Sequence, residues 1–288
     1  LVGSEMCIRD RWHTVPGLCY LTPYKEYKDN GIARVLNFAG LVPPEQSRFF
    51  NWSKPFVQLE TTRGCFNTCA FCVSGGEKPV RTLSIESIRR RLQLIHAHGI
   101  KNVRVLDRTF NYNPRRAKEL LRLFLEFHPD IRFHLEIHPA LLSEELKEEL
   151  SLLPKGLLHL EAGIQSLREP VLEKSRRMGK LSDALDGLRF LCALPNMETH
   201  ADLIAGLPLY HLHEIFEDVR TLAEYAAGEI QLESLKLLPG TEMRRRAEES
   251  GIKYSPLPPY EVLQTHEINV SELQTARQLS RLLDGFYN

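Results

Sequence analysis

The sequence lacks several features that would tie it to a membrane or to a nucleic acid. Its 37 Lys and Arg residues are matched by 37 Asp and Glu residues, so no net charge attracts a polyanion. No apolar run is long enough to span a bilayer, and no clear signal peptide opens the chain. We therefore predict no nucleic-acid partner and no membrane association. With 43% hydrophobic and 26% charged residues, the composition is that of a globular protein with an ordinary core.

Cysteines are few, and their spacing does not form a disulfide framework. Six occur in 288 residues, which favours a reducing environment, and we predict a cytoplasmic location. Three of them, Cys65, Cys69 and Cys72, fall in one stretch with the spacing C-x3-C-x2-C, directly after a short apolar run. Cys19 and Cys192 stand alone, and we do not expect them to be ligands.

The three clustered cysteines predict a metal centre. Soft thiolates that converge on one point select zinc, copper(I) or an iron–sulfur cluster. A structural zinc site needs four ligands, usually from two C-x2-C pairs, and the sequence has no second pair. An iron–sulfur cube also takes four ligands, so three cysteines would leave one iron open to a further ligand. We favour the open cluster over a closed zinc site.

From residue 55 to about residue 240 the hydrophobic pattern alternates between strands and helices. Strands are predicted at 56–61, 102–106, 131–138, 156–165, 199–207 and 229–238. Helices are predicted after them at 84–98, 114–127, 143–153, 169–177, 182–193, 213–227 and 242–249, with Ser84 and Ser143 as N-caps. Six βα units in series predict a parallel sheet. We therefore predict an α/β fold, a partial (β/α)6 TIM-like barrel, since a full barrel has eight units.

The predicted strands also show which side chains face the interior. In 131–138 the polar side chains of His134, Glu136 and His138 alternate with apolar ones, and in 156–165 the same holds for His159, Glu161, Gly163 and Gln165. The apolar set belongs against the helices, so the polar set would line a wet cavity. Alternatively, His134 and His138 bond each other or the backbone near the rim. A mononuclear metal site of His134, Glu136 and His159 is a further alternative.

The cysteine spacing, with the aromatic Phe71 directly before the third cysteine, resembles the signature of the radical S-adenosylmethionine (SAM) enzymes. The resemblance implies that Cys65, Cys69 and Cys72 hold a [4Fe–4S] cluster whose open iron binds the amino and carboxylate groups of SAM. It also implies reductive cleavage of SAM to methionine and a 5′-deoxyadenosyl radical. The partial six-unit barrel is that family's usual fold.

The same resemblance implies a set of SAM contacts at the carboxyl ends of the strands, where barrel active sites lie. Asp107 or Thr109 would contact the amino-acid moiety, although Asp107 could instead cap a loop. Glu161 would contact the ribose or methionine part, Arg177 the carboxylate, and Gly206 would let the backbone approach the adenosine. The full set also includes backbone at Leu238 that pairs with adenine, together with Phe71, Gln165 and Asp202. Gly75-Gly76-Glu77 lies beside the cysteines, so we do not count it as a SAM motif.

The motif DRTFN, residues 107–111, resembles a branch of radical SAM proteins of unassigned reaction that usually carry a cobalamin-binding domain. The resemblance implies methyl transfer, methylthiolation or hydrogen abstraction on a small-molecule or peptide substrate, with cobalamin supplied by a domain missing from this chain. It also implies an electron donor such as flavodoxin or ferredoxin. The alternative is a non-catalytic metal- or cluster-binding interaction module, which would need a filled fourth ligand position.

Four segments are predicted. Residues 1–11 resemble a translated sequencing-adapter artefact, 12–54 form an N-terminal linker region, 55–250 form the barrel, and 251–288 form a helical C-terminal extension. Ser271 and Gln274 are predicted to form the capping box of the last helix. We expect both true termini to be missing.

Overall fold

The computed structural model describes residues 11–33, 35, 37, 40–225 and 227–288. The chain forms two compact units, residues 1–41 and 42–288. In the first, strands β1 (Cys19–Leu21) and β2 (Tyr27–Asp29) form an antiparallel hairpin. Most of the predicted artefact at 1–11 lies outside the described residues, and the predicted linker at 12–54 is divided between the two units. Among the described residues, no helix has the length and apolar character needed to cross a membrane.

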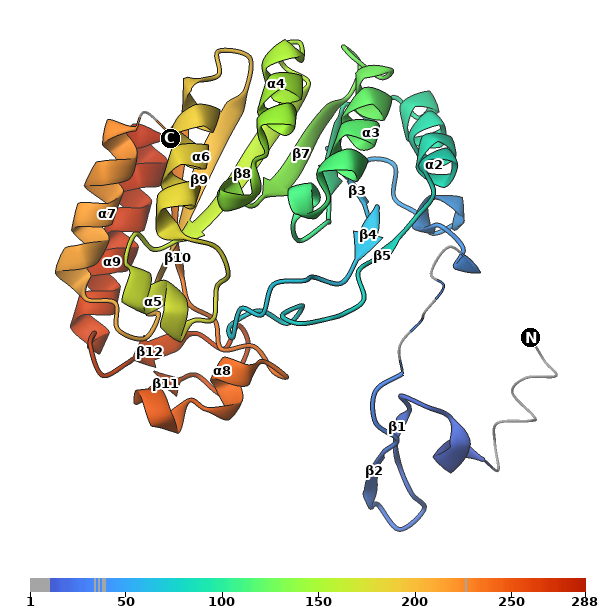
Figure 1. Cartoon of the computed structure of the whole chain (residues 1–288). Helices are drawn as coiled ribbons and strands as arrows, with labels where there is room; N and C mark the ends of the chain where they lie inside the picture. Colours follow the sequence, from blue (N-terminus) through green and yellow to red (C-terminus); the bar gives the residue numbers. More distant parts are fainter. Residues whose placement is uncertain (1–10, 34, 36, 38–39, 226) are drawn as a thin grey trace. The chain divides into compact units, whose positions relative to one another are not determined.

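The second unit is built on a six-stranded parallel sheet that curves into an arch (Figure 1), as predicted. The strand order is β10-β9-β8-β7-β6-β3, so each strand lies beside the one before it in the chain. The bounds are β3 Val57–Leu59, β6 Asn102–Val105, β7 Arg132–Ile137, β8 Leu158–Gln165, β9 Glu198–Ala205 and β10 Glu229–Ser234. The sheet does not close, because β3 and β10 are both edge strands.

Helices cover the outer face of the arch (Figure 1). They are α2 Ile85–Ala97, α3 Pro114–Leu125, α4 Glu144–Leu152, α6 Leu181–Ala193 and α7 Leu212–Glu224, with the short α5 Glu169–Lys174 and α8 Glu242–Arg245 near the carboxyl ends of the strands. The apolar residues of each strand point to these helices: the ring of Phe133 on β7 stacks on Phe124 of α3 with centroids 4.1 Å apart. Ser84 and Ser143 cap α2 and α4 as predicted.

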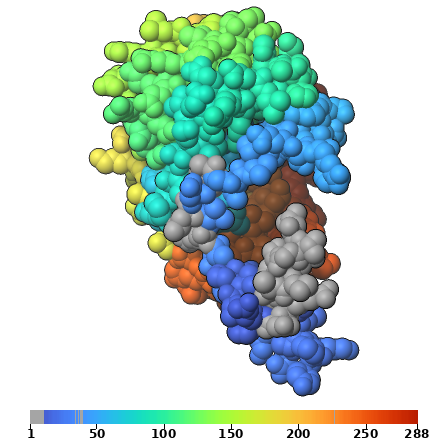
Figure 2. Space-filling view, turned by 90° about the vertical axis from the view of Figure 1, so that its right-hand side faces the viewer, coloured from blue at the N-terminus to red at the C-terminus, as the bar shows by residue number. Residues whose placement is uncertain are grey.

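The polar residues of the same strands face the concave side. Along β7 and β8 the buried apolar side chains alternate with half-buried polar ones, which confirms the predicted inward polar face. The space-filling view shows a hollow in the body of residues 42–288, with orange-brown atoms from a later part of the chain at its back (Figure 2). The interior of this half-barrel is therefore polar and open.

The C-terminal extension packs against the last strand. It contains β11 (Lys253–Tyr254), β12 (Val262–Gln264), α9 (Val270–Leu282) and a final π-helical turn, Leu283–Tyr287. Asn288 donates to and accepts from the backbone of Ile230 on β10, and so covers part of that strand's open edge. The predicted capping box was wrong: Asn269 caps α9 and Glu272 completes the box, since their side chains reach the first free N–H groups.

Candidate active site at the cysteine loop and the inner face of the barrel

The cysteine loop leaves the carboxyl end of β3 and is closed at its base by a short antiparallel pair, β4 (Thr62–Arg63) with β5 (Arg81–Thr82). The backbone N–H of Cys65 donates to the carbonyl of Glu77, and that of Gly76 donates to Asn67. A Cβ on Gly75 would lie 2.5 Å from the carbonyl oxygen of Cys69, so this position admits no larger residue without a shift. The two glycines thus fold the loop tightly around the cysteines.

The loop is docked onto the carboxyl ends of distant strands. The N–H of Ala70 donates to the carbonyl of Ser175, beyond α5, and the N–H of Met243 in α8 donates to the carbonyl of Ala70. Figure 1 shows the loop crossing the open side of the arch to reach these elements. A cavity of about 160 Å³ lies between the loop and α8, and Cys69 and Cys72 form part of its wall. The cysteines are therefore held at the end of the barrel where active sites lie.

The three thiols of the loop are free and largely buried. Cys65 and Cys69 are both less than a tenth exposed. Burial raises the pKa of Cys69, while the nearby guanidinium of Arg177 counteracts this, with Nη1 3.8 Å from Sγ. Among the described cysteines, the exposed Cys19 is on β1, and burial raises the pKa of Cys192 to about 11.

The spacing of the thiols argues against a closed zinc site. Among the described residues, Cys65, Cys69 and Cys72 do not all have their sulfur atoms within 4.8 Å of one another, and no histidine or carboxylate completes such a group with them. Thiolates on one tetrahedral zinc would be about 3.8 Å apart, since each Zn–S bond is about 2.3 Å long. The three thiols as they stand are therefore not grouped closely enough for one zinc ion.

Asp107 ties the first two strands together at the mouth of the loop. It is 1% exposed and its Oδ1 accepts from the N–H groups of Thr61 and Thr62, both at 2.8 Å, while its Oδ2 accepts from the Thr61 hydroxyl. Burial raises the pKa of Asp107 above its ordinary value despite these hydrogen bonds. The geometry favours the loop-capping alternative. Thr109, by contrast, lies beside the cysteine loop, with its hydroxyl 3.9 Å from Sγ of Cys65.

Arg177 joins the cysteine loop to the end of β8. Its second guanidinium nitrogen donates to the carbonyl of Gly163. Gln165 has a left-handed backbone conformation (φ 74°), and its side chain folds back over Gly163. A Cβ on Gly163 would lie 2.6 Å from the side-chain nitrogen of Gln165. The helix predicted at 169–177 ends at Lys174, which leaves Arg177 on the loop that follows and free to reach inward. Arg177 and Gln165 are therefore both placed at the mouth of the barrel.

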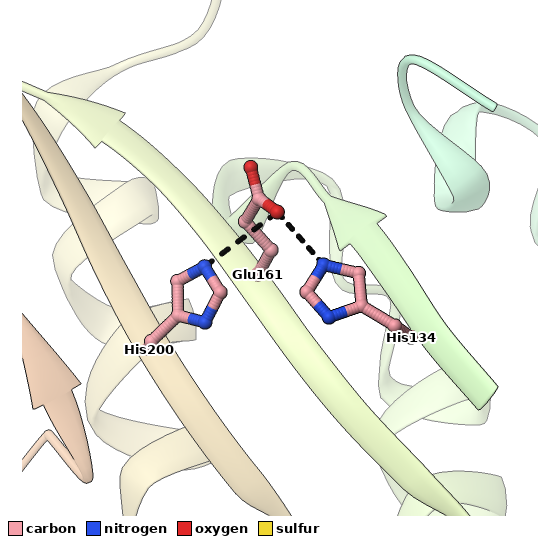
Figure 3. Close-up of side chains that lie close together, drawn as sticks. All are labelled: His134, Glu161 and His200. Atoms are coloured by element: carbon pink, nitrogen blue, oxygen red, sulfur yellow. Dashed lines mark hydrogen bonds and ion pairs between the residues drawn. The ribbon is translucent and has the colours of Figure 1, made fainter. Parts of the chain in front are cut away.

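Three neighbouring strands bring His134, Glu161 and His200 together in the interior (Figure 3). Oε2 of Glu161 lies 2.8 Å from Nε2 of His134 and 3.6 Å from Nε2 of His200. Burial alone would raise the pKa of Glu161, but the close contacts and charges of the two imidazoles hold it below its ordinary value. The sequence analysis did not single out His200, although its alternation with Asp202 and Ile204 on β9 was the available signal.

More carboxylates line the same face. Burial and the charge of Glu161 raise the pKa of Glu136 to about 7, against the opposing effect of Arg108 at 3.5 Å. Burial and Glu161 likewise raise the pKa of Asp202 well above its ordinary value. Burial lowers the pKa of His159 to about 4, with His200 as the next cause. The interior therefore concentrates acid–base groups of unequal proton affinity.

The remaining predicted residues have diverse surroundings. His138 does not bond His134; it bonds the carbonyl of Met178 at 3.0 Å, one of the two alternatives considered. Gly206 has a positive φ of 92°, a backbone conformation that favours glycine, and a Cβ there would make only ordinary contacts with Leu273, Leu235 and Val262. The carbonyl of Leu238 accepts from the Thr241 hydroxyl at 2.8 Å, and Phe71 is half-buried. Their contacts with SAM stay predictions.

Comparison with known proteins places this site in context. The profile of the radical SAM superfamily matches residues 59–222, and that of a protein family of unknown function (DUF4080) matches residues 248–288. The ribosomal protein uS12 methylthiotransferase RimO of Moorella thermoacetica is 28% identical over 190 residues, 61% of this chain and 43% of RimO. The tRNA-2-methylthio-N(6)-dimethylallyladenosine synthase of Herpetosiphon aurantiacus is 25% identical over 210 residues, 67% and 46% of the respective chains.

Solved structures agree in fold. The cobalamin-dependent SAM radical enzyme OxsB has a TM-score of 0.69 at 17% identity, covering 97% of this chain and 48% of OxsB. The radical SAM methyltransferase TsrM of Kitasatospora setae has a TM-score of 0.59 at 21% identity, covering 78% and 45%. The chain thus spans less than half the length of these relatives.

Proposed function

The chain belongs to the radical SAM superfamily, and we propose that it is the SAM-cleaving part of a larger enzyme, with a [4Fe–4S] cluster on Cys65, Cys69 and Cys72. The observation that carries this proposal is the docked cysteine loop with its three free thiols. The guanidinium of Arg177 lies beside Cys69 and also donates to Gly163 near the carboxyl end of β8. The positive charge beside the thiols favours the thiolate form that binds iron.

These residues fit the cluster, which when bound supplies the electron that cleaves SAM into methionine and a 5′-deoxyadenosyl radical. The thiolates would hold three irons, and the loop glycines would keep their backbone in place. Arg177 would exchange its bond to the Gly163 carbonyl for the carboxylate of SAM, a charge-assisted pair. Thr109 and Gln165 lie near enough to the loop to orient the same end of the molecule. Phe71, Gly206 and Leu238 complete the proposed set.

For the full-length protein we propose a cobalamin-dependent reaction, supported by the DRTFN motif at 107–111 and by a fold shared with OxsB and TsrM. Methyl transfer to a carbon of a small-molecule or peptide substrate is the reaction that such a carrier serves, whereas methylthiolation is the activity named for the curated relatives. Flavodoxin or ferredoxin would supply the electron, in the cytoplasm. The neutral overall charge supports neither a nucleic-acid substrate nor a membrane partner.

Anaerobic reconstitution tests the proposal. The chain should bind about four irons and four sulfides per molecule, and with dithionite and SAM it should form 5′-deoxyadenosine slowly. Replacing Cys65, Cys69 and Cys72 together with alanine should abolish both, while Cys192→Ala, which removes a buried thiol elsewhere, should change neither. An intact cluster and bound SAM without any 5′-deoxyadenosine would refute the activity. A triple variant that keeps its iron and sulfide would refute the cluster assignment.

A further inference from the structure

We propose that the inner face of the barrel carries a second metal site, in which His134, Glu161 and His200 bind one divalent transition-metal ion such as Zn²⁺. The three side chains come from β7, β8 and β9 and converge on one point (Figure 3). Their ligand atoms all lie within 4.8 Å of one another. None of the three is a cysteine, so this site is chemically separate from the one on the loop.

The distances suit a small ion. Nitrogen and oxygen ligands about 2.0–2.1 Å from a tetrahedral metal are about 3.3 Å from each other. Glu161 Oε2 is 2.8 Å from the Nε2 atom of His134 and 3.6 Å from that of His200, so the observed spacings bracket this value. The ligand atoms of His134 and His200 lie within 4.8 Å of each other, so closing this gap around the ion would complete the coordination. Two imidazoles and one carboxylate are a ligand set typical of zinc and of non-haem iron(II).

Two buried atoms beside Glu161 make no hydrogen bond. The His200 side chain is 2% exposed, and its Nε2 lies 3.4 Å from Oδ1 of Asp202 and 3.6 Å from Oε2 of Glu161, but neither contact is a hydrogen bond. Oδ1 of Asp202 is also buried and makes no hydrogen bond. Buried polar atoms are nearly always hydrogen-bonded, so these two long contacts are unusual. A cation bound by His200 would replace them, with Asp202 as the acceptor for a metal-bound water.

A second layer of side chains holds the site. Nδ1 of His200 lies 2.8 Å from Nε2 of His159, which in turn lies close to Arg132 through its Nδ1, at 3.0 Å. Metal-binding histidines usually engage their second nitrogen in this way. Arginine can only donate hydrogen bonds, so Nδ1 of His159 accepts from Arg132, and Nε2 of His159 donates to Nδ1 of His200. In the metal-free protein the proton of His200 is therefore on Nε2. Metal binding at Nε2 would reverse these hydrogen bonds, and His159 would donate its Nδ1–H to Glu198, the present partner of Arg132.

The arrangement leaves the metal accessible. The side chains of His134 and Glu161 are 23% and 30% exposed, toward the hollow of the barrel. A structural zinc site is closed by four protein ligands, whereas three ligands and an open side are typical of a catalytic one. The ion could therefore bind a polar substrate oxygen or a water molecule in the same interior that the strand ends enclose.

The experiment uses the chain with Cys65, Cys69 and Cys72 all replaced by alanine, so that the loop cannot bind metal. After treatment with a chelator, it is titrated anaerobically with Co²⁺, followed by visible absorption, and then with Zn²⁺ in competition. We expect one tightly bound equivalent with a four- or five-coordinate spectrum and a rise in melting temperature. His134→Gln, Glu161→Gln and His200→Gln, each added singly, should weaken binding more than about 100-fold.

Matched variants make the outcome decisive. His213→Gln alters an exposed histidine outside the cluster and should leave the titration unchanged. Arg132→Met removes the hydrogen-bond donor to Nδ1 of His159 and a nearby positive charge, and both oppose metal binding at His200. We therefore expect this variant to bind the metal about tenfold more tightly. Partial unfolding would weaken binding, so it cannot explain such a gain in affinity. Binding only at millimolar metal, or binding that survives Glu161→Gln and His134→Gln but not His159→Gln, would overturn the assignment. Because the test needs neither cluster nor SAM, its failure would leave the proposed function standing.

Discussion

Replacing Asp107 separates its two predicted roles. Asp107→Ala would leave the N–H groups of Thr61 and Thr62 buried without an acceptor. Each unsatisfied group costs about 1–3 kcal/mol, so we expect the free energy of unfolding to fall by about 2–6 kcal/mol. This is a large part of the stability of a typical domain. The loop that carries Cys65 begins at these threonines, so the variant should also lose cluster occupancy.

Asp107→Asn should behave differently, because the amide keeps an oxygen for both N–H groups. Its nitrogen can donate to the Thr61 hydroxyl, which then turns its own proton away. Burial raises the pKa of Asp107, so the folded state holds this proton more tightly than the unfolded state does. Wild-type stability should therefore fall as pH rises from about 3.9 through the folded pKa, and the Asn variant should lack this fall.

The assay is urea unfolding followed by circular dichroism between pH 4 and pH 8, with iron content and SAM binding measured anaerobically on the same preparations. We expect Asp107→Asn to stay within about 1 kcal/mol of wild type and to bind SAM normally. An Asn variant that folds and holds its cluster but no longer binds SAM would show that Asp107 contacts the cofactor. An Ala variant of wild-type stability would refute the loop-capping role.

Three further predictions concern the loop, a buried ion pair and the inner face. Gly75→Ala places a Cβ 2.5 Å from the carbonyl of Cys69 and should cost about 1–3 kcal/mol and reduce bound iron. Glu45→Ala strands the buried guanidinium of Arg91, now 2.6 Å from the carboxylate, and should cost about 3–5 kcal/mol in chemical unfolding. The pKa of Glu136 is about 7 in the folded state, so the folded state binds this proton more tightly than the unfolded state does. The free energy of unfolding should therefore fall as pH rises from 4.5 to 7, and Glu136→Gln should remove up to about 3 kcal/mol of this fall.

Simple controls accompany these variants. Gly285→Ala meets no atom within 4 Å and should be neutral in stability and iron content. Arg115→Ala breaks only an exposed pair with Glu119 and should cost less than about 1 kcal/mol. Iron content of Gly75→Ala equal to wild type would contradict the packing argument. A pH profile of Glu136→Gln that is parallel to wild type would contradict the proposed burial of that carboxyl.

The sequence by itself determined the features that depend on local spacing. The C-x3-C-x2-C motif predicts a three-thiolate centre because residues so close on one loop lie near each other. The period-two alternation in 131–138 and 156–165 identified the polar inner face, since successive side chains of a strand point to opposite sides. Ser84 and Ser143 marked helix starts because capping bonds join residues only three apart. The last helix was misplaced by two residues because a Ser and an Asn–Glu pair compete for the same role.

Only the tertiary structure decided which of these residues meet. Alternation places His134 and Glu161 on the inner face, but their contact is diagonal: His134 lies opposite His159, and Glu161 lies opposite His200. The alternative metal site considered from the sequence joined His134 with Glu136 and His159, whereas the ligand atoms that converge with His134 in the described residues are those of Glu161 and His200. Alternation fixes which face a side chain occupies, but the stagger of one strand against the next also depends on packing between residues far apart in the chain, so alternation alone does not tell which inward residues meet. The same holds for Asp107, whose partners lie 45 and 46 positions away, just after β3, a strand that pairs with β6 only in the folded sheet.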